Sequence, residues 1–140
     1  MTIGHWRLAT LAWACVIWTL SSSPFASENS RTLVRQILDS LSDGRVPESV
    51  AWWINIISRK TAHTVEFALL AVLVYMACGF RGRSAWLCAV TAAVAFGIVD
   101  EIHQSWVPGR GTSPVDCMLD AVGAVLGTSL LARWRRDPLF

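Results

Sequence analysis

Three side chains able to do acid–base or anion-binding chemistry stand together near the middle of the chain. Lys60, His63 and Glu66 are spaced three residues apart. On a helix, this spacing spreads them over about a third of the circumference. Such a set offers a general base in His63 or Glu66 and a phosphate-binding cation in Lys60.

A second polar segment runs from Asp100 to Gln104. Asp100, His103 and Gln104 share one helical face, whereas Glu101 points about 100° away from it. Arg110 follows in a short loop before the last apolar stretch. Asp100 and Glu101 are further candidates for a general base, and Arg110 is a second candidate for binding a phosphate.

Two aspartates follow near the start of the last apolar stretch. Asp116 and Asp120 lie on the same helical stripe as Gly123 and Gly127. Glycines four residues apart allow helices to pack closely in membranes, so this stripe is expected to face other helices. Both aspartates are therefore predicted to point into a helix bundle.

The same polar segments raise the question of a metal site. Carboxylate–histidine pairs three residues apart on facing helices can hold a divalent ion. The candidate ligands are His63, Glu66, Asp100 and His103. The four cysteines show neither a CxxC motif nor a Cys/His spacing typical of zinc. We predict no cofactor, with a divalent metal as the less favoured alternative.

The segments that must position these residues are unusually apolar. Of 140 residues, 54% are hydrophobic and 16% are charged, against about 25% charged in ordinary soluble domains. The length allows one domain, which we place at residues 1–140. The net charge of +2 and the lack of a Lys/Arg run argue against nucleic acid as a partner. The composition favours a membrane protein.

Four apolar stretches predict four membrane-spanning helices, at about residues 5–23, 60–79, 84–104 and 114–133. Crossing the hydrocarbon takes about 20 residues, which the first and third reach only with their polar flanks. Outside a closed barrel, only helices satisfy every backbone group in lipid. The predicted fold class is an all-α membrane protein, a four-transmembrane-helix bundle.

Arginines in the short connections predict the orientation. They flank one side of the four spans: Arg7, Arg81, Arg83, Arg133, Arg135 and Arg136. Since positive charge stays inside, we predict a multi-pass protein of the bacterial inner (cytoplasmic) membrane with both termini cytoplasmic. An alternative is a cleaved signal peptide at the amino terminus, but Pro24 disfavours cleavage after Ser23 or Ala26.

The one sizeable loop, residues 24–59, contains an amphipathic pattern. Its apolar residues recur at helical spacing opposite Arg31, Arg35, Asp39 and Asp43, and Ser30 is the expected N-cap. We predict an external amphipathic helix on the outer membrane surface between spans one and two. A second interfacial piece is expected at residues 50–57. Both pieces could also simply cover the bundle.

Taken singly, several polar residues have plain structural explanations. Ser113 followed by Pro114 is typical of a helix start that includes Asp116, and Lys60 could extend to the headgroups. Taken together they argue for one site, because charges at membrane depth are costly unless paired or functional. The predicted binding residues are Lys60, His63, Glu66, Asp100, Glu101, His103, Gln104, Arg110, Asp116 and Asp120.

This shared site makes three geometric predictions. His63 is expected within direct or one-water reach, about 3 to 6 Å, of Asp100, Glu101 or Asp116. Arg110 is expected to fold back over the site and pair with a carboxylate. Asp120 is expected one turn deeper, bonded to a polar group of span two or three.

The ordered motifs resemble those of VanZ-like membrane proteins. The first is Ser58-Arg59-Lys60-x-x-His63-x-x-Glu66-Phe67, and the second is Asp100-Glu101-x-His103-Gln104-x-x-Val107-Pro108-Gly109-Arg110. The third is Ser113-x-x-Asp116-x-x-x-Asp120-x-x-Gly123-x-x-x-Gly127, and Leu20-Ser21-Ser22-Ser23-Pro24 also fits. The resemblance covers nearly the whole chain. Asp120 stands where many members have Asn.

The resemblance implies a protein of the bacterial cell envelope linked to antibiotic resistance, through lowered teicoplanin susceptibility. The expected partners are membrane lipids, lipid-linked cell-wall precursor or a glycopeptide, and an oligomer stays open. One alternative is an outer-leaflet enzyme acting on a lipid-linked or phosphate-bearing substrate. A second alternative is a small multidrug-type transporter. Such a transporter requires an acidic residue in span one, and residues 8–20 contain none, which disfavours it.

Overall fold

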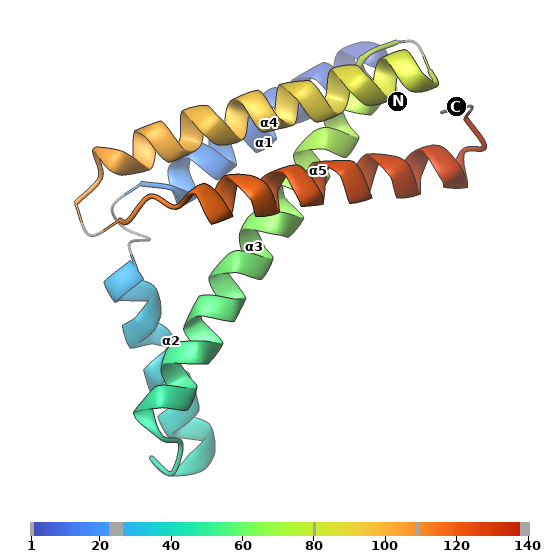
Figure 1. The fold of residues 1–140 in the computed structure, drawn as a ribbon. Helices are drawn as coiled ribbons and strands as arrows, with labels where there is room; N and C mark the ends of the chain where they lie inside the picture. The colour runs from blue at the N-terminus through green and yellow to red at the C-terminus, as the bar shows by residue number, and fades with distance from the viewer. Residues whose placement is uncertain (1, 23–26, 80, 109, 138–140) are drawn as a thin grey trace.

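The computed structural model describes residues 2–22, 27–79, 81–108 and 110–137, which form five helices and their connections (Figure 1). The helices are α1 (Ile3–Leu20), α2 (Ser27–Ser42), α3 (Glu48–Ala77), α4 (Arg83–Ser105) and α5 (Pro114–Trp134). No strand occurs in these ranges, and the all-helical prediction is confirmed. Ser23, Pro24, Ala26 and Gly109, which entered the sequence argument, lie outside the described residues.

Three of the described helices, α3, α4 and α5, are long and apolar enough to cross a membrane. They contain the predicted spans at residues 60–79, 84–104 and 114–133, apart from a few residues at the ends. α1 has 18 residues and carries His5 and Arg7 in its first two turns, so its apolar part is shorter. The helices are those of a membrane protein.

α3 is much longer than the span predicted for it. The predicted interfacial piece at residues 50–57 is part of this helix, which runs unbroken from Glu48 to Ala77, and its position at the membrane interface stays a prediction. The stretch contains neither Gly nor Pro, so no residue interrupts the helical hydrogen bonds. The prediction of Ser30 as an N-cap is wrong, since α2 already begins at Ser27.

α2 and the first turns of α3 form a helical hairpin that projects from the other helices (Figure 1). Arg31 and Arg35 of α2 both bond to Glu48 at the start of α3, the second at 3.5 Å. Arg35 also donates to the carbonyl oxygen of Val46 at 2.9 Å. The hairpin leaves one apolar row of α2 exposed: Leu33, Ile37 and Leu41.

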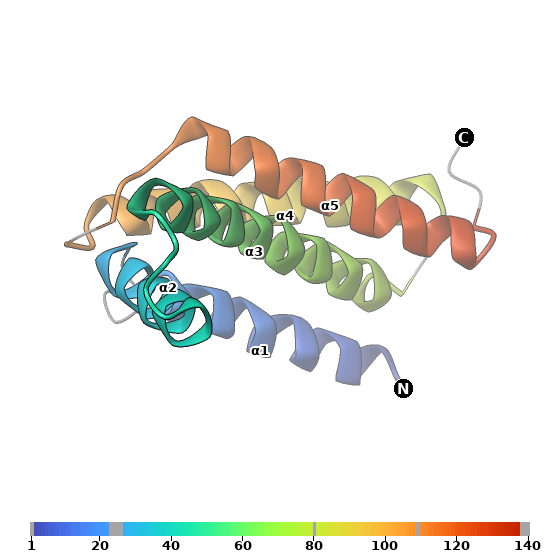
Figure 2. The same ribbon diagram turned by 90° about the horizontal axis from the view of Figure 1, so that it is seen from below.

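α3 lies between α1 on one side and α4 and α5 on the other (Figure 2). Its buried core residues include Phe67, Leu70 and Ala71. α4 presents a buried small residue at every turn, namely Ala85, Ala89, Ala93 and Gly97. Small residues let helix backbones approach closely in the absence of a hydrophobic driving force. The first turn of α1 and the last turn of α5 lie at the same end of the bundle (Figure 2).

α3 and α5 approach each other most closely at two glycines. A Cβ atom added to Gly123 would lie 2.1 Å from the carbonyl oxygen of Thr64, and one added to Gly127 would lie 2.7 Å from that of Ala68. The predicted close-packing stripe is confirmed. Because the residue numbers rise together on both helices, α3 and α5 run in the same direction.

Gly123→Ala is expected to destabilise the protein, because the added methyl group would overlap the backbone of α3. We expect the free energy of unfolding in mixed micelles to fall by about 2 kcal/mol. Gly111→Ala is the matched control, since a Cβ atom there meets nothing within 4 Å. Equal stability of the two variants would show that the helices do not touch at Gly123.

Candidate functional site

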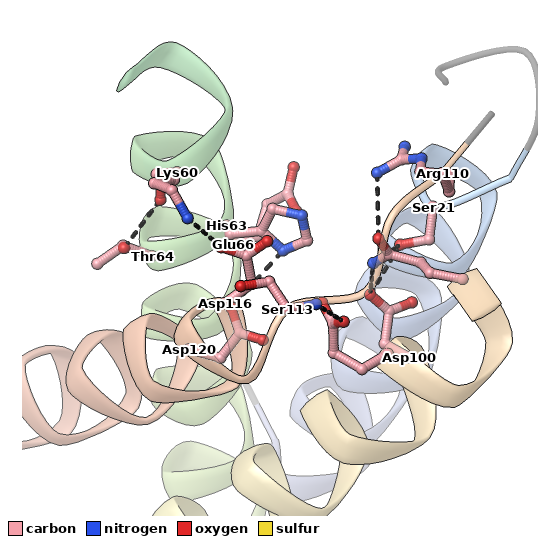
Figure 3. A network of polar contacts seen from close by, with 12 residues as sticks. Ser21, Lys60, His63, Thr64, Glu66, Asp100, Arg110, Ser113, Asp116 and Asp120 are labelled. Atoms are coloured by element: carbon pink, nitrogen blue, oxygen red, sulfur yellow. Dashed lines mark hydrogen bonds and ion pairs between the residues drawn. The ribbon is translucent and has the colours of Figure 1, made fainter. Parts of the chain in front are cut away.

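The predicted site residues gather at the end of the bundle away from the first turn of α1 and the last turn of α5. They come from the middle of α3, the end of α4, the start of α5 and the connection at residues 106–113 (Figure 3). The end of α1 closes the group through Leu20 and Ser21. Segments up to 90 residues apart in sequence therefore meet in one polar network.

Two ion pairs join α3 to α5. Lys60 Nζ lies 2.5 Å from Asp116 Oδ1, and His63 Nδ1 lies 3.6 Å from Asp120 Oδ1 (Figure 3). The first pair is at the rim, where the side chains of Lys60 and Asp116 are 39% and 18% exposed. The second pair is buried, with side-chain exposures of 10% for His63 and 1% for Asp120. The depth of the two pairs follows from their position along the helices.

The direct contact of His63 is with Asp120, a residue that was not among its predicted neighbours. The reason is the parallel course of α3 and α5: His63 lies one turn below Lys60, so it meets the aspartate one turn below Asp116. The predicted reach of about 3 to 6 Å to Asp100, Glu101 or Asp116 stays a prediction. Asp120 lies one turn deeper than Asp116, as predicted, but the bond predicted for it is only a 3.6 Å ion-pair contact with His63 of α3.

Asp120 is an unusual buried carboxylate. Neither of its oxygens has a hydrogen-bond partner among the described residues, and the 3.6 Å contact to His63 is longer than a hydrogen bond. α4 packs tightly beside it, since a Cβ atom added to Gly97 would lie 3.2 Å from Asp120 Oδ2 and 3.3 Å from the ring of Phe67. A carboxylate in such surroundings needs a counter-charge or a proton. His63 is placed to supply it.

Asp100 organises the second half of the network. Its Oδ2 atom accepts hydrogen bonds from Ser21 Oγ and from Gln104 Nε2, both at 2.8 Å. With 1% exposure, Asp100 is buried and not at a water-facing rim. It ties the end of α1 to the end of α4, which makes it a positioning residue.

Arg110 folds back over the site, as predicted. It donates to Gln104 Oε1 at 3.4 Å and to the carbonyl oxygen of Leu20, and its predicted pairing with a carboxylate stays a prediction. Leu20 ends α1, where carbonyl groups lack helical partners and favour a cation. Burial and the nearby Arg59 lower the pKa of Arg110 from its usual value. Neighbouring carboxylates, first Asp100, oppose that shift.

Glu101 connects α4 to the start of α5. Its Oε2 atom accepts a hydrogen bond from the backbone N–H of Ser113 at 3.0 Å, and its Oε1 atom is buried without a hydrogen-bond partner in the described part of the chain. The side chain of Ser113 accepts from the N–H of Val115 at 3.2 Å, with Pro114 at the first helical position. The predicted helix cap is confirmed, and Asp116 additionally pairs with Lys60.

A small charged pocket opens beside His63. Its volume is about 150 Å³, and its lining residues are Leu20, Ser21, Ser30, Arg59, Ala62, His63, Glu66 and Arg110. The space is therefore surrounded by two guanidinium groups, an imidazole and two hydroxyl groups. Glu66 adds one carboxyl group to the lining. Guanidinium groups and hydroxyls are the donors that recognise phosphate.

An apolar groove of about 570 Å³ runs between α4 and α5. Glu101 and Ser113 lie in its wall, and most of its other lining residues are apolar: Val94, Ile98, Ile102, Pro114, Met118 and Ala121. Glu101 thus belongs both to the polar network and to a groove wide enough for an apolar chain.

His103, one of the candidate metal ligands, packs against α1. Its ring stacks on Trp18 of α1 with centroids 3.9 Å apart and an interplanar angle of 23°. Across the described residues, no three His, Cys, Asp or Glu side chains come together in a way that could hold a metal ion. The set His63, Glu66, Asp100 and His103, all of them described, is therefore not assembled as a metal centre.

Ser21 and Arg59 are missing from the predicted site, although their side chains take part in the network or its pocket. Ser21 bonds to Asp100, and Arg59 lines the pocket. The signals were present in sequence, since Ser21 belongs to the serine run after the first span and Arg59 adjoins Lys60. Neither signal says which helix the side chain faces, so neither residue could be assigned from spacing alone.

The VanZ/LLP1 family profile matches residues 6–135, which include all these site residues. The chain belongs to the VanZ/LLP1 family. It has no significant match among curated proteins or among solved structures. Residues of the three motifs that resemble those of VanZ-like proteins thus meet in the polar network described above.

In this VanZ-like protein, Asp100→Leu is expected to destabilise the fold more than Asp100→Asn. The leucine leaves Ser21 and Gln104 without their buried acceptor, at a cost of about 2 kcal/mol, whereas asparagine retains an acceptor oxygen. The free energy of unfolding in mixed micelles measures both. Equal losses for the two variants would mean that the negative charge, and not the acceptor, holds α1 to α4.

Proposed function

We propose that this protein is a single-domain protein of the bacterial inner membrane that crosses the bilayer four times, through α1, α3, α4 and α5. An even number of crossings agrees with the first turn of α1 and the last turn of α5 lying at one end of the bundle. Six of the eleven arginines, those of the short connection and of the two terminal segments, belong to that end: Arg7, Arg81, Arg83, Arg133, Arg135 and Arg136. By the positive-inside rule both termini are then cytoplasmic, and the polar site faces outward.

In this orientation, α2 lies on the outer surface of the membrane. Its row of exposed Leu33, Ile37 and Leu41 suits burial at the boundary between headgroups and hydrocarbon. Trp52 and Trp53 of α3 are also exposed at this end, where tryptophan is favoured. The hairpin of α2 and α3 would thus rest beside the opening of the charged pocket.

Cysteine labelling tests the orientation. In a variant with all four natural cysteines replaced by alanine, a membrane-impermeant maleimide added to intact cells should label Ser40→Cys in α2 and spare Ser84→Cys in α4. Both positions are exposed, so access to the reagent depends on the side of the membrane. Permeabilised cells serve as the control, in which both label. The reverse pattern in intact cells would invert the topology.

We further propose that the outward site binds the phosphate-bearing head of an envelope lipid or of a lipid-linked cell-wall precursor. The observation that carries this proposal is the pocket lined by Arg59, His63 and Arg110. Two guanidinium groups around one small space repel each other, and an anion between them relieves that repulsion. Lys60 and Asp116 at the rim add polar groups for a larger head.

The apolar groove between α4 and α5 supports a lipid over a free anion. A lipid carries its charged head and its apolar chain on one molecule. Here the groove and the charged pocket share no lining residue, but Glu101 of the polar network also lines the groove. A protein that holds lipid-linked material at the outer leaflet would alter what a glycopeptide meets there. We include in this proposal that the protein influences teicoplanin susceptibility by this route.

The packing below the site favours binding at one face over transport. Beneath Asp120 the buried core is apolar, with Phe67, Leu70, Ala71, Ala93 and Ala124. The backbones of α3 and α5 touch at Gly123 and Gly127, which leaves little room for a polar path between these two helices. This arrangement speaks against the multidrug-type transporter.

A second candidate function is hydrolysis of the bound lipid phosphate. The observation that favours it is the pair of His63 with buried Asp120, because a carboxylate that orients a histidine is a common device for general-base catalysis. His63 would take a proton from water as the water oxygen attacks phosphorus. The bond from phosphorus to the lipid oxygen would break, and that oxygen would take up a proton.

One experiment tests binding and hydrolysis together. The purified protein is incubated with dioctanoyl phosphatidic acid, and both its thermal stabilisation and the release of inorganic phosphate are followed. Arg59→Gln should weaken binding by about tenfold or more, through loss of a charge-assisted hydrogen bond. Arg45→Gln, an exposed arginine outside the pocket, should not.

His63→Gln separates the two functions. If the site is hydrolytic, this variant should still bind the lipid but release no phosphate above background. If neither the unmodified protein nor His63→Gln releases phosphate while both bind the lipid, the binding function stands and the hydrolytic function is refuted. Equal affinity of the Arg59→Gln and Arg45→Gln variants for the lipid would refute the proposal that this pocket binds phosphate.

A further inference from the structure

A second charged cavity lies at the opposite end of the bundle from the candidate functional site. Its volume is about 390 Å³, within the range of roughly 300–1,000 Å³ typical of ligand sites. It lies between the start of α1, the end of α3 and the end of α5. Its lining residues are Ile3, Trp6, Tyr75, Met76, Gly79, Arg81 and Arg135.

Asp137 organises the charges around this cavity. Its side chain is 5% exposed and accepts a hydrogen bond from the hydroxyl of Tyr75 at 2.8 Å. Arg81 and Arg135 each lie 3.6 Å from the same carboxylate. One carboxylate thus faces two guanidinium groups, and each guanidinium has five N–H donors. The site therefore has a net positive charge, and some guanidinium N–H groups remain available to a ligand.

Arg135 is poorly satisfied by the protein. One of its terminal N–H groups points at the sulfur of Met76, at 2.9 Å, and thioether sulfur is a weak acceptor. Its Nε atom is buried and makes no hydrogen bond to the described residues. Buried guanidinium donors normally meet oxygen acceptors. An anion in the cavity would supply them.

The geometry points to this cavity as a binding site for the phosphate of an anionic phospholipid headgroup, in the leaflet opposite to the candidate functional site. Arg81 and Arg135 would bind the phosphate. Basic pockets between membrane helices at the level of the headgroups recognise anionic lipids in this way. In the topology proposed above, this is the cytoplasmic leaflet.

The walls of the cavity favour a lipid over free phosphate. Ile3 and Met76 are apolar, and Trp6 is the kind of side chain that lies at the membrane interface. A lipid seated here would also bridge α1 to α3 and α5. The protein's own contacts at this point are modest: Arg7 Nε donates to the carbonyl oxygen of Ala77 at 3.5 Å, and Ile3 packs beside Gly79.

The test is the thermal stabilisation of the full-length protein in a neutral detergent. Dioctanoyl phosphatidylglycerol should raise Tm by about 4 °C or more at saturation. Dioctanoyl phosphatidylcholine and inorganic phosphate at the same concentration should not. An equal shift with inorganic phosphate alone would overturn the lipid assignment, and no shift with phosphatidylglycerol would overturn the site.

Matched arginine variants locate the effect. Arg81→Gln and Arg135→Gln should each weaken the apparent affinity for phosphatidylglycerol by about tenfold, whereas Arg133→Gln, which does not line the cavity, should leave it unchanged. Equal weakening by Arg133→Gln would reduce the effect to net charge and overturn the proposal. If Arg135→Gln fails to fold, Arg81→Gln suffices, because its side chain is 64% exposed.

Arg59→Gln separates this cavity from the outward site. Stabilisation by phosphatidylglycerol that persists in Arg59→Gln and disappears in Arg81→Gln assigns the lipid to this cavity. The opposite pattern assigns the lipid to the outward pocket: it overturns this inference while agreeing with the function proposed for the outward site.

Discussion

The close contact of α3 and α5 is the constraint on which the polar site depends. At Gly123 and Gly127, the surface of α5 has no side chain, and the carbonyl oxygens of Thr64 and Ala68 occupy that space. Two helices that touch through backbone atoms cannot slide past each other, because every other register would place a side chain in the contact.

This register brings Asp120 opposite His63 and, one turn higher, the rim pair of Lys60 and Asp116. Packing deep in the bundle thus determines which charges meet above it.

Charged side chains of both signs lie at each end of the bundle. Five acids lie around the outward site in the proposed topology, and the arginine-rich end carries Asp137 as its buried acid. In each case a buried carboxylate has an organising role: Asp100 joins α1 to α4, and Asp137 holds two guanidinium groups and the hydroxyl of Tyr75. Buried charges are costly, and a membrane protein retains them where they are paired or where they serve a ligand. Several buried polar atoms make no hydrogen bond within the described residues, among them atoms of Asp120, Glu101 and Arg135, and there the protein alone does not complete its hydrogen bonds.

Much of this could be predicted from local sequence. The apolar lengths predict the helices, Ser113 and Pro114 predict the start of α5, and the two glycines predict its packing face. The differences from prediction occur where the neighbouring element decides. The tryptophans in the first turns of α3 suggest a separate interfacial piece, yet nothing in the chain interrupts the helix. His103 shares a helical face with Asp100 in sequence, but its ring packs on Trp18, since a face this wide meets more than one neighbour.

The sequence by itself determined the fold class, the positions of the apolar helices and the set of polar residues near one end of the bundle, because these depend on spacing along one helix and on the cost of charge in lipid. Only the tertiary structure decided the pairs within that set. The pairing of His63 with Asp120 and of Asp100 with Ser21 joins segments 57 to 79 residues apart in the chain. Such pairs depend on where two helices cross and how each is rotated. Those quantities are set by packing between helices, and no spacing within a single helix contains them.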